Sequence, residues 1–282
     1  MVLDKLFKPK TGQLSAGHFF IYIFLSLANF TSHAKETVKV DYEFQKIFFV
    51  DISKSGNNLI AVGERGIIFS SIDDGKTWEG FQLRDKSTLT SVTYIDKNSA
   101  IFVGHRGAAF ITSDQGKSVV KINLPKIKKN DSLLRVRKIS HSHIVLVGAW
   151  GLFFESFDNG KSWKRQLIHS TEFDRHLYDV ISTRHGLLAV GESGTLILRQ
   201  KKKRNWTTLN SEYNGSFFGI NKDTQGNYFL YGMRGKIFKV KLESYINEKK
   251  IPSFSKIDTD LTASWMSSLS LKDGSVLFFG DG

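Results

Sequence analysis

Short apolar runs that end in glycine recur at regular intervals along the chain. Each run has four consecutive apolar residues, as in Leu59–Val62 and Ile144–Val147. Runs of this length are typical of strands that are covered on both faces. The glycines that close the runs are 41 to 48 residues apart, and they are Gly63, Gly104, Gly148, Gly191, Gly232 and Gly280. A period of about 40–50 residues without helical patterning indicates the four-stranded antiparallel blades of a β-propeller.

A further strand is expected before each apolar run. It carries two apolar residues three positions apart, such as Ile47 and Val50 in the first repeat and Leu89 and Val92 in the second. We interpret it as the innermost strand of each blade. After each run, a glycine-containing turn leads into a third strand. The chain is therefore predicted to be an all-β propeller with five full blades and a partial sixth.

The sixth repeat begins at about Ala263 and reaches residue 282 after its second strand. We expect the sequence to be a piece of a longer chain, whose propeller would have six or seven blades. The alternative is that another part of the chain supplies the missing strands, and Glu36–Tyr42 is the local candidate. Without such strands, the sixth blade would expose a sheet edge.

A second motif follows the third predicted strand of the first repeat, Ser71-Ile-Asp-Asp-Gly-Lys-Thr-Trp78. It resembles the Asp-box of the bacterial neuraminidase repeat, in which an Asp accepts backbone N–H groups, a Gly takes the left-handed conformation and a Trp packs back on the sheet. The resemblance implies structural roles for Asp73, Gly75, Trp78, Asp114, Gly116, Asp158, Gly160 and Trp163. The second copy ends in Val119, the fourth repeat has 199–206 in place of the box and keeps only Trp206, and the fifth has no recognisable box.

The N-terminal segment has the pattern of an export signal. Three lysines precede the twelve-residue apolar run Phe19–Phe30, and Ser32-His-Ala34 is a small-x-small cleavage site. A helix of twelve residues spans about 18 Å, which is short of the roughly 30 Å hydrocarbon core. We therefore predict a cleaved signal over 1–34, a propeller over 35–282, and a periplasmic or equivalent location, possible membrane association included.

The composition limits the partners and the kinds of site that the chain can have. The formal net charge is +13, which favours an anionic partner or else reflects a solvated lysine-rich surface. Cysteine is absent, so disulfides, thiolate metal sites and cysteine nucleophiles are excluded. His141 and His143 could share one strand face, but no third ligand at a fixed spacing accompanies them, so no metal site is predicted. No cofactor or small-molecule substrate is expected, and export argues against nucleic acid as a partner.

Several repeats also resemble the photosystem II stability and assembly factor propellers, a family with homologues in non-photosynthetic bacteria. The resemblance rests on Leu59-Ile-Ala-Val-Gly-Glu-Arg-Gly66, Phe102-Val-Gly-His-Arg-Gly107, Leu188-Ala-Val-Gly-Glu-Ser-Gly-Thr195 and Tyr231-Gly-Met-Arg-Gly235. It extends over about 43–282. It implies a non-enzymatic exported propeller that helps to assemble or stabilise a membrane-protein complex.

One position of the turn after the apolar run is a candidate binding site. Arg65, Arg106 and Arg234 occupy this position in three repeats, and Trp150 occupies it in a fourth. Propeller symmetry would place the four side chains on one face, where guanidinium groups could bind carboxylates of a protein partner. The alternative is that they are solvated turn residues.

The competing function is a glycoside hydrolase of the sialidase type, because such enzymes also carry Asp-boxes. A sialidase requires three arginines, a Tyr–Glu pair and an acid/base Asp. The neighbours Glu212 and Tyr213 would point to opposite faces of a strand, and no Phe/Tyr-Arg-Ile-Pro stretch opens the domain. The sequence therefore favours a protein-binding propeller without catalytic residues.

Overall fold

We describe a computed structural model, and within it the unit Glu36–Gly282. The residues described are 36–43, 46–168, 173–201, 203, 205–242, 245 and 252–281. The predicted export signal over 1–34 and its cleavage site lie outside them. Within these ranges, no helix has the length and apolar character needed to cross a membrane.

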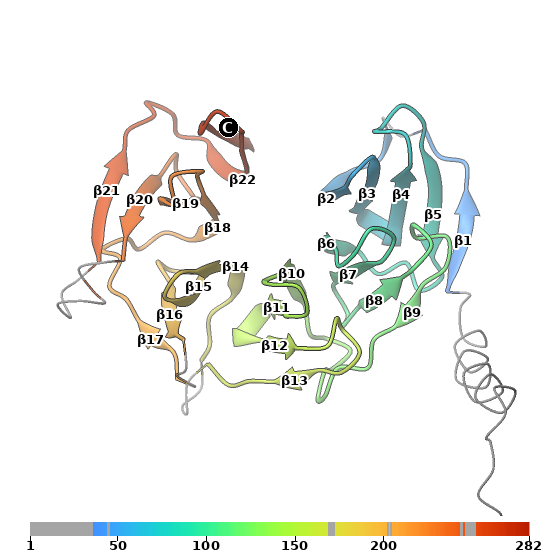
Figure 1. Cartoon of the computed structure of the whole chain (residues 1–282), viewed down its shortest axis with the longest axis horizontal. Coiled ribbons are helices and arrows are strands. Elements are labelled where there is room, and N and C mark those ends of the chain that lie inside the picture. Colours follow the sequence, from blue (N-terminus) through green and yellow to red (C-terminus); the bar gives the residue numbers. More distant parts are fainter. Residues whose placement is uncertain are drawn as a thin grey trace, which may run out of the picture. The chain divides into compact units, whose positions relative to one another are not determined.

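Antiparallel sheets make up the described chain, and each sheet corresponds to one sequence repeat (Figure 1). The strands of the first blade are β1 (Thr37–Val40), β2 (Phe49–Ser55), β3 (Asn58–Gly63), β4 (Ile67–Ser71) and β5 (Glu79–Leu83). Those of the second are β6 (Leu89–Tyr94), β7 (Ala100–Gly104), β8 (Ala109–Thr112) and β9 (Val120–Lys121). Those of the third are β10 (Leu133–Lys138), β11 (Ile144–Gly148), β12 (Phe153–Ser156) and β13 (Lys164–Arg165).

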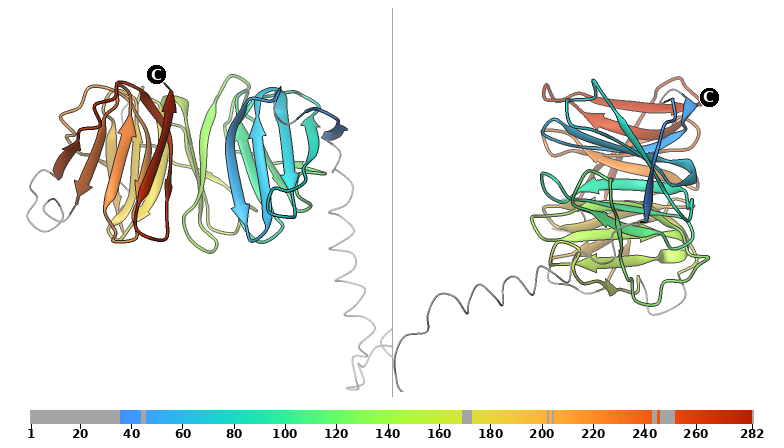
Figure 2. Two further views of the ribbon diagram at one scale, coloured as in Figure 1. Left: turned by 90° about the horizontal axis from the view of Figure 1, so that it is seen from above. Right: turned by 90° about the vertical axis from the view of Figure 1, so that its right-hand side faces the viewer.

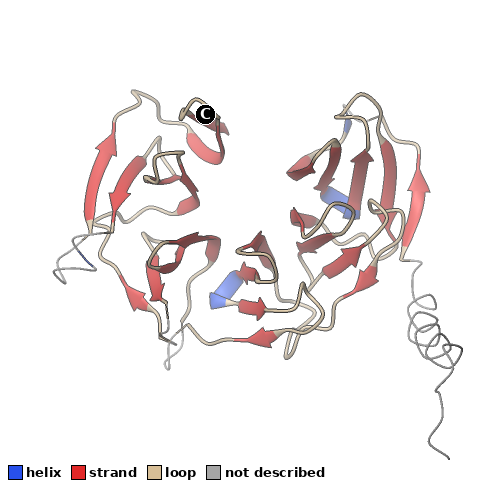
Figure 3. Cartoon of the chain, in the orientation of Figure 1, coloured by secondary structure: helices blue, strands red, loops and turns tan. Residues whose placement is uncertain are grey.

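The remaining repeats follow the same order. The fourth blade contains β14 (Leu177–Thr183), β15 (Gly186–Gly191), β16 (Leu196–Gln200) and β17 (Thr207–Thr208). The fifth contains β18 (Phe217–Lys222), β19 (Tyr228–Gly232), β20 (Ile237–Lys241) and β21 (Ser253–Ile257). The sixth sheet has β22 (Ser264–Ser270) and β23 (Val276–Asp281). Strands dominate, with 3₁₀ turns at Glu64–Gly66 and Ala149–Gly151 (Figure 3).

The sheets are arranged as the blades of a propeller. Each first strand contacts the first strand of the next blade, in the order β2, β6, β10, β14, β18 and β22. These strands lie nearest the centre in Figure 1, and neighbouring strands run up and down beside one another in Figure 2. The predicted all-β propeller with five full blades and a partial sixth is confirmed.

One detail of the sequence interpretation was wrong, and the structure does not support one of its alternatives. The apolar pair of the first innermost strand is Phe49 and Ile52, because Phe49 pairs with Gly63 as Leu89 pairs with Gly104. Glu36–Tyr42 does not complete the sixth blade. Its strand β1 pairs with β5 and forms a fifth, outer strand of the first blade.

The core forms between blades, which explains the continuous apolar runs. In β11, Ile144 and Leu146 pack with residues of the second blade, whereas Val145 and Val147 pack with residues of the fourth. All four are fully buried. Successive side chains of a strand point to opposite faces, so a strand between two neighbours needs apolar residues at every position.

The glycine at the end of each turn between second and third strands joins one blade to the next. In blades two, three and four its N–H donates to a carbonyl two residues before the next innermost strand, as in Gly107 to Asp131 and Gly194 to Gly215, both at 2.7 Å. Gly194 has φ of 69°, and a Cβ there would lie 1.7 Å from the carbonyl oxygen of Tyr213. Glycine is therefore needed for both the backbone conformation and the close approach.

Candidate functional site

The turns between second and third strands place the predicted binding residues at equivalent positions. Each such residue has a left-handed backbone, with φ of 53° for Arg65, 60° for Arg106, 53° for Trp150 and 56° for Arg234. Ser193 has the corresponding position in the fourth blade, with φ of 50°. In an antiparallel blade these turns all lie at one edge, so we call this edge the turn face.

The three arginines of the turn face are exposed and separate. They belong to blades one, two and five, and within the described residues none of their side chains makes a hydrogen bond or ion pair. Arg106 lines a hollow of about 400 Å³ together with Lys121, Lys128 and Lys129. Asp85 also lines this hollow, so four cations face one carboxylate, and the excess of positive charge favours binding of an anionic group.

An aromatic row crosses the turn face toward the innermost strands. Trp150 is 64 % exposed and meets His176 edge-on at 4.7 Å between ring centroids. The row continues through Tyr178 to Phe218, whose rings are 5.6 Å apart. The backbone N–H of Trp150 donates to Nδ1 of His176 at 3.2 Å and fixes the start of the row.

Sequence reasoning identified Trp150 but missed the rest of this row. Tyr178 and Phe218 occupy bulges, where the register shifts between Leu177 and Asp179 in β14 and between Phe217 and Gly219 in β18. A bulge turns its extra side chain away from the strand's alternating pattern. The sequence did contain one indication of this row. Tyr178 and Phe218 both come directly after the first apolar residue of their innermost strands, Leu177 and Phe217.

Two carboxylates link the innermost strands to one another. Asp51 accepts the backbone N–H of Val92 at 3.0 Å, and Asp179 accepts that of Ile220 at 3.2 Å. Asp179 also accepts two bonds from Arg137, at 2.7 and 2.8 Å. Asp179 has no exposed surface.

The electrostatic environment keeps Asp179 charged. Burial alone would raise the pKa of the Asp179 carboxyl, but the nearby guanidinium groups of Arg137 and Arg135 hold the pKa below its usual value. A carboxylate so engaged is suited to joining blades. It is a poor general acid, which needs a raised pKa.

The predicted Asp-boxes of the first three blades have the same geometry. Asp73 accepts the backbone N–H and the hydroxyl of Thr77 at 2.9 and 2.6 Å, and the hydroxyl of Ser71 at 2.7 Å. Trp78 Nε1 donates to the carbonyl of Gly75 at 3.0 Å. Asp114 and Asp158 accept the equivalent bonds from Ser118 and Ser162, Trp163 donates to Gly160, and Gly75, Gly116 and Gly160 have φ of 82° to 87°.

These hydrogen bonds change the acidity of the box carboxyls. The hydroxyl and backbone N–H of Ser162 lower the pKa of Asp158 to about 2, and those of Thr77 lower the pKa of Asp73 further. The boxes join third to fourth strands, so they lie at the edge opposite the turn face. The box aspartates accept hydrogen bonds from residues of their own turns.

The fourth blade shows what the loss of the box changes. Trp206 is still buried, at 4 % exposure, but its Nε1 has no hydrogen-bond partner within the described residues. In the second blade the apolar Val119 is fully buried at the Trp position. Packing at this position therefore persists without the hydrogen bond.

The two histidines of the third blade do not form a pair. His143 Nε2 lies 2.9 Å from Oε1 of Glu155, whereas His141 is exposed. Among the residues that the structure describes, no group of three or more His, Asp or Glu side chains is arranged to hold a metal ion.

Fold and site together define a β-propeller with cations on one face. No family model matches the sequence, and no curated protein matches it. Among solved structures, the chain is similar to "YCF48 bound to D1 peptide", with a TM-score of 0.66 and 16 % identity over 87 % of this chain and 80 % of that one. YCF48 from Cyanidioschyzon merolae gives a TM-score of 0.65 and 17 % identity, covering 87 % and 83 % of the two chains.

An enzyme of the same architecture is also similar. An ancestral GH74 enzyme gives a TM-score of 0.55 and 13 % identity over 74 % of this chain, which spans 31 % of that enzyme. At these identities the likeness establishes the propeller fold alone.

Proposed function

We propose that this protein is an exported, non-enzymatic propeller that binds an acidic segment of a membrane-protein complex and assists its assembly. The observation that carries the proposal is the repeated placement of exposed Arg65, Arg106 and Arg234 at one turn position. The proposal is supported by the similarity to YCF48, which was solved with a D1 peptide. The location in the periplasm or its equivalent rests on the sequence of 1–34.

The chemistry of the turn face fits a peptide partner. A guanidinium group can bind a carboxylate through two parallel hydrogen bonds, and the exposed ring of Trp150 offers an apolar surface at the equivalent turn position of another blade. Spread over several blades, these groups match a segment with more than one acidic residue better than a single small anion.

The experiment measures binding of a labelled peptide of alternating Asp and Ala residues by fluorescence anisotropy. Each of Arg65→Ala, Arg106→Ala and Arg234→Ala should weaken binding by about 1.5–3 kcal/mol, the range for hydrogen bonds to charged groups. Lysine at the same positions should restore little of the affinity, because it lacks the planar fork.

Ser193→Ala is the matched control, since this residue has the same turn position without a charge. Normal binding by all three alanine variants would contradict the proposal. Complete rescue by lysine would reduce the turn face to a diffuse positive field.

The alternative, a glycoside hydrolase, is favoured by the similarity to the GH74 enzyme. Against it, glycosidases use two carboxyl groups across a substrate cleft, one with a raised pKa, whereas the pKa of the innermost-strand Asp179 is lowered. Assays with fluorogenic sialosides and glucosides separate the two functions. Turnover that disappears in Asp51→Asn while the variant keeps its fold by circular dichroism would establish catalysis.

A further inference from the structure

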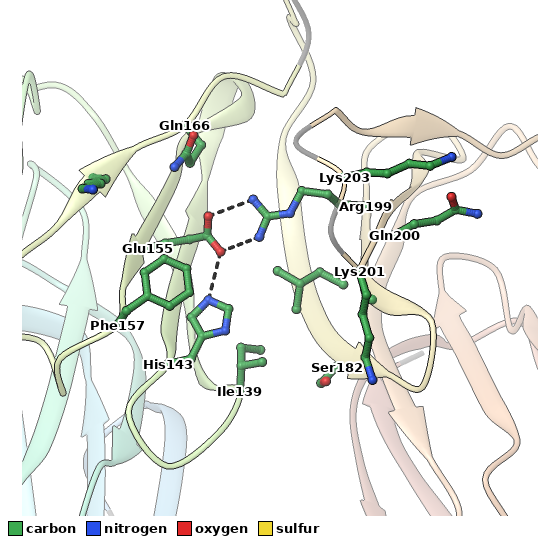
Figure 4. A pocket seen from close by; sticks show the side chains of 13 residues that line it. Ile139, His143, Glu155, Phe157, Gln166, Ser182, Arg199, Gln200, Lys201 and Lys203 are labelled. Atoms are coloured by element: carbon green, nitrogen blue, oxygen red, sulfur yellow. Dashed lines mark hydrogen bonds and ion pairs between the residues drawn. The ribbon is translucent and has the colours of Figure 1, made fainter.

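A cavity of about 560 Å³ lies between blades three and four, at the edge opposite the turn face (Figure 4). We call it the seam cavity. Its walls come from the turns between first and second strands and from the segments that follow the third strands. Ile139, His143, Glu155 and Phe157 come from blade three, and Leu187, Arg199, Lys201 and Lys203 from blade four.

The wall from blade four occupies the place of the missing Asp-box. In blade three Ser156 pairs with Ile144, and in blade four Arg199 pairs with Leu187, so Arg199 has the first box position. Counting onward, Lys201 replaces the box aspartate. Lys203 replaces the box glycine. The segment that lost the box therefore gained positive charges on the wall of the seam cavity.

A buried carboxylate fixes this arrangement. Glu155 is 2 % exposed and accepts two bonds from Arg199 of the next blade, at 2.5 and 2.8 Å, and its Oε1 also lies 2.9 Å from His143 Nε2. Burial alone would raise the pKa of Glu155, but Arg199 and His143 hold it below its usual value. The Arg199 guanidinium is also held over the Trp206 ring, 5.3 Å from its centroid.

One side of the cavity is aromatic. Phe157, the second residue of the intact box, stacks on His143 with 4.4 Å between ring centroids and 19° between planes. Phe157 is 59 % exposed, so much of its surface is available to a ligand. The bonds that Asp158 accepts from Ser162 hold the turn that presents it.

The cations of the cavity outnumber its carboxylates. Glu155 already neutralises Arg199, whereas Lys164, Lys201 and Lys203 have no ion-pair partner within the part of the chain that the structure describes. Lys164 lies on blade three and the other two on blade four, so both walls of the cavity carry positive charge. A single small anion could neutralise one wall at a time, whereas carboxylates spaced along a peptide reach both.

We propose that the seam cavity binds an acidic peptide segment that carries an aromatic side chain, with Phe157 contacting the aromatic residue and the three lysines contacting the carboxylates. The site is separate from the turn face and lies at the opposite edge of the blades. The propeller thus has two cationic sites, which can hold two acidic segments at the same time.

The experiment measures binding of a labelled peptide, Gly-Asp-Glu-Phe-Glu-Asp-Gly, to the full chain. Binding is measured by fluorescence anisotropy at physiological salt. The double substitution Lys201→Glu with Lys203→Glu should weaken binding at least about tenfold, because it reverses two charges at the site. Its matched control is Lys76→Glu with Lys97→Glu, an equal change of net charge on exposed lysines of other blades, which should leave affinity within about twofold.

A second pair of variants tests the aromatic contact. Phe157→Ala should weaken binding about fivefold, and a peptide with Ala in place of Phe should bind Phe157→Ala and the unchanged protein equally. Ile72→Ala is the control, since Ile72 has the same box position in blade one and is 69 % exposed. Equal losses from both alanine variants would overturn the aromatic contact.

Two further outcomes would overturn the proposal. One is unchanged binding in the charge-reversed double variant together with loss of binding in Arg65→Ala, which would assign this peptide to the turn face. The other is displacement of the peptide by inorganic phosphate at equal concentration, which would identify a small-anion site. The Arg65→Ala variant should keep the part of the binding that the Lys201→Glu, Lys203→Glu variant loses, so failure of this proposal and failure of the proposed function are distinguishable.

Discussion

The second strands of blades two and six, β7 and β23, have the same place in their repeats but differ in burial. In β7 every residue is buried, and Phe102 has no exposed surface. In β23, which has the same place in its repeat, Leu277 is 43 % and Phe279 is 51 % exposed. The innermost strand of the first blade, β2, is also partly exposed, since Ile52 is 55 % exposed. β7 lies between two neighbouring blades, whereas β2 and β23 belong to the two ends of the described series (Figure 1).

The comparison shows that an apolar run in a repeat protein is buried only where a neighbouring blade covers each of its faces. Stability should therefore depend on a residue's place in the series more than on its identity.

The largest difference is expected for phenylalanine truncation. Phe102→Ala should lower the free energy of unfolding by about 3–5 kcal/mol, because it removes a fully buried ring between blades. Phe279→Ala should cost less than about 1 kcal/mol, since half of this ring is already in water. Urea denaturation followed by tryptophan fluorescence measures both. Equal losses would show that β23 is covered in solution.

A second difference concerns the carboxylate that joins innermost strands. Asp179→Ala should destabilise the protein by about 2–4 kcal/mol, because it leaves Arg137 and the N–H of Ile220 without their acceptor. Ser267 has the corresponding position in β22, and Ser267→Ala should cost less than about 0.5 kcal/mol. An effect of Asp179→Ala as small as that of Ser267→Ala would contradict the assigned role.

Acidification should weaken the same link between innermost strands, because it protonates Asp179. The pKa of Asp179 in the folded protein lies below its unfolded value of about 3.9, so its charge stabilises the fold above about pH 4. This contribution is lost as pH falls through the folded pKa. Melting temperatures measured between pH 6 and about 2.5 should drop below pH 4, and Asp179→Asn should flatten part of that drop. An identical slope in the variant would assign the acid sensitivity elsewhere, for example to Asp158 with its pKa of about 2.

The smallest expected difference lies between an intact and a replaced box. Trp163 Nε1 donates to Gly160, whereas Trp206 Nε1 has no acceptor within the described residues. Trp163→Phe should therefore cost about 1 kcal/mol more than Trp206→Phe in the same unfolding measurement. A larger loss for Trp206→Phe would mean that stacking with Arg199 outweighs the hydrogen bond.

The sequence by itself determined the repeat, the strands and the turns. Gly63, Gly104 and their equivalents marked the end of the second strand in the first five blades, and the turn that follows places Arg65, Arg106, Trp150 and Arg234 at one backbone position. Such features are local, because glycine conformation and side-chain alternation act within a few residues.

The tertiary structure decided what depends on contacts between blades. The pairing of Phe49 with Gly63 placed the first apolar pair at Phe49 and Ile52, and β1 paired with β5 at the outer edge of the first blade. The seam cavity required Glu155 of one blade to meet Arg199 of the next, 44 residues away. No local pattern encodes such a meeting, since it follows from how adjacent sheets pack, and packing is set by the whole surface of both partners.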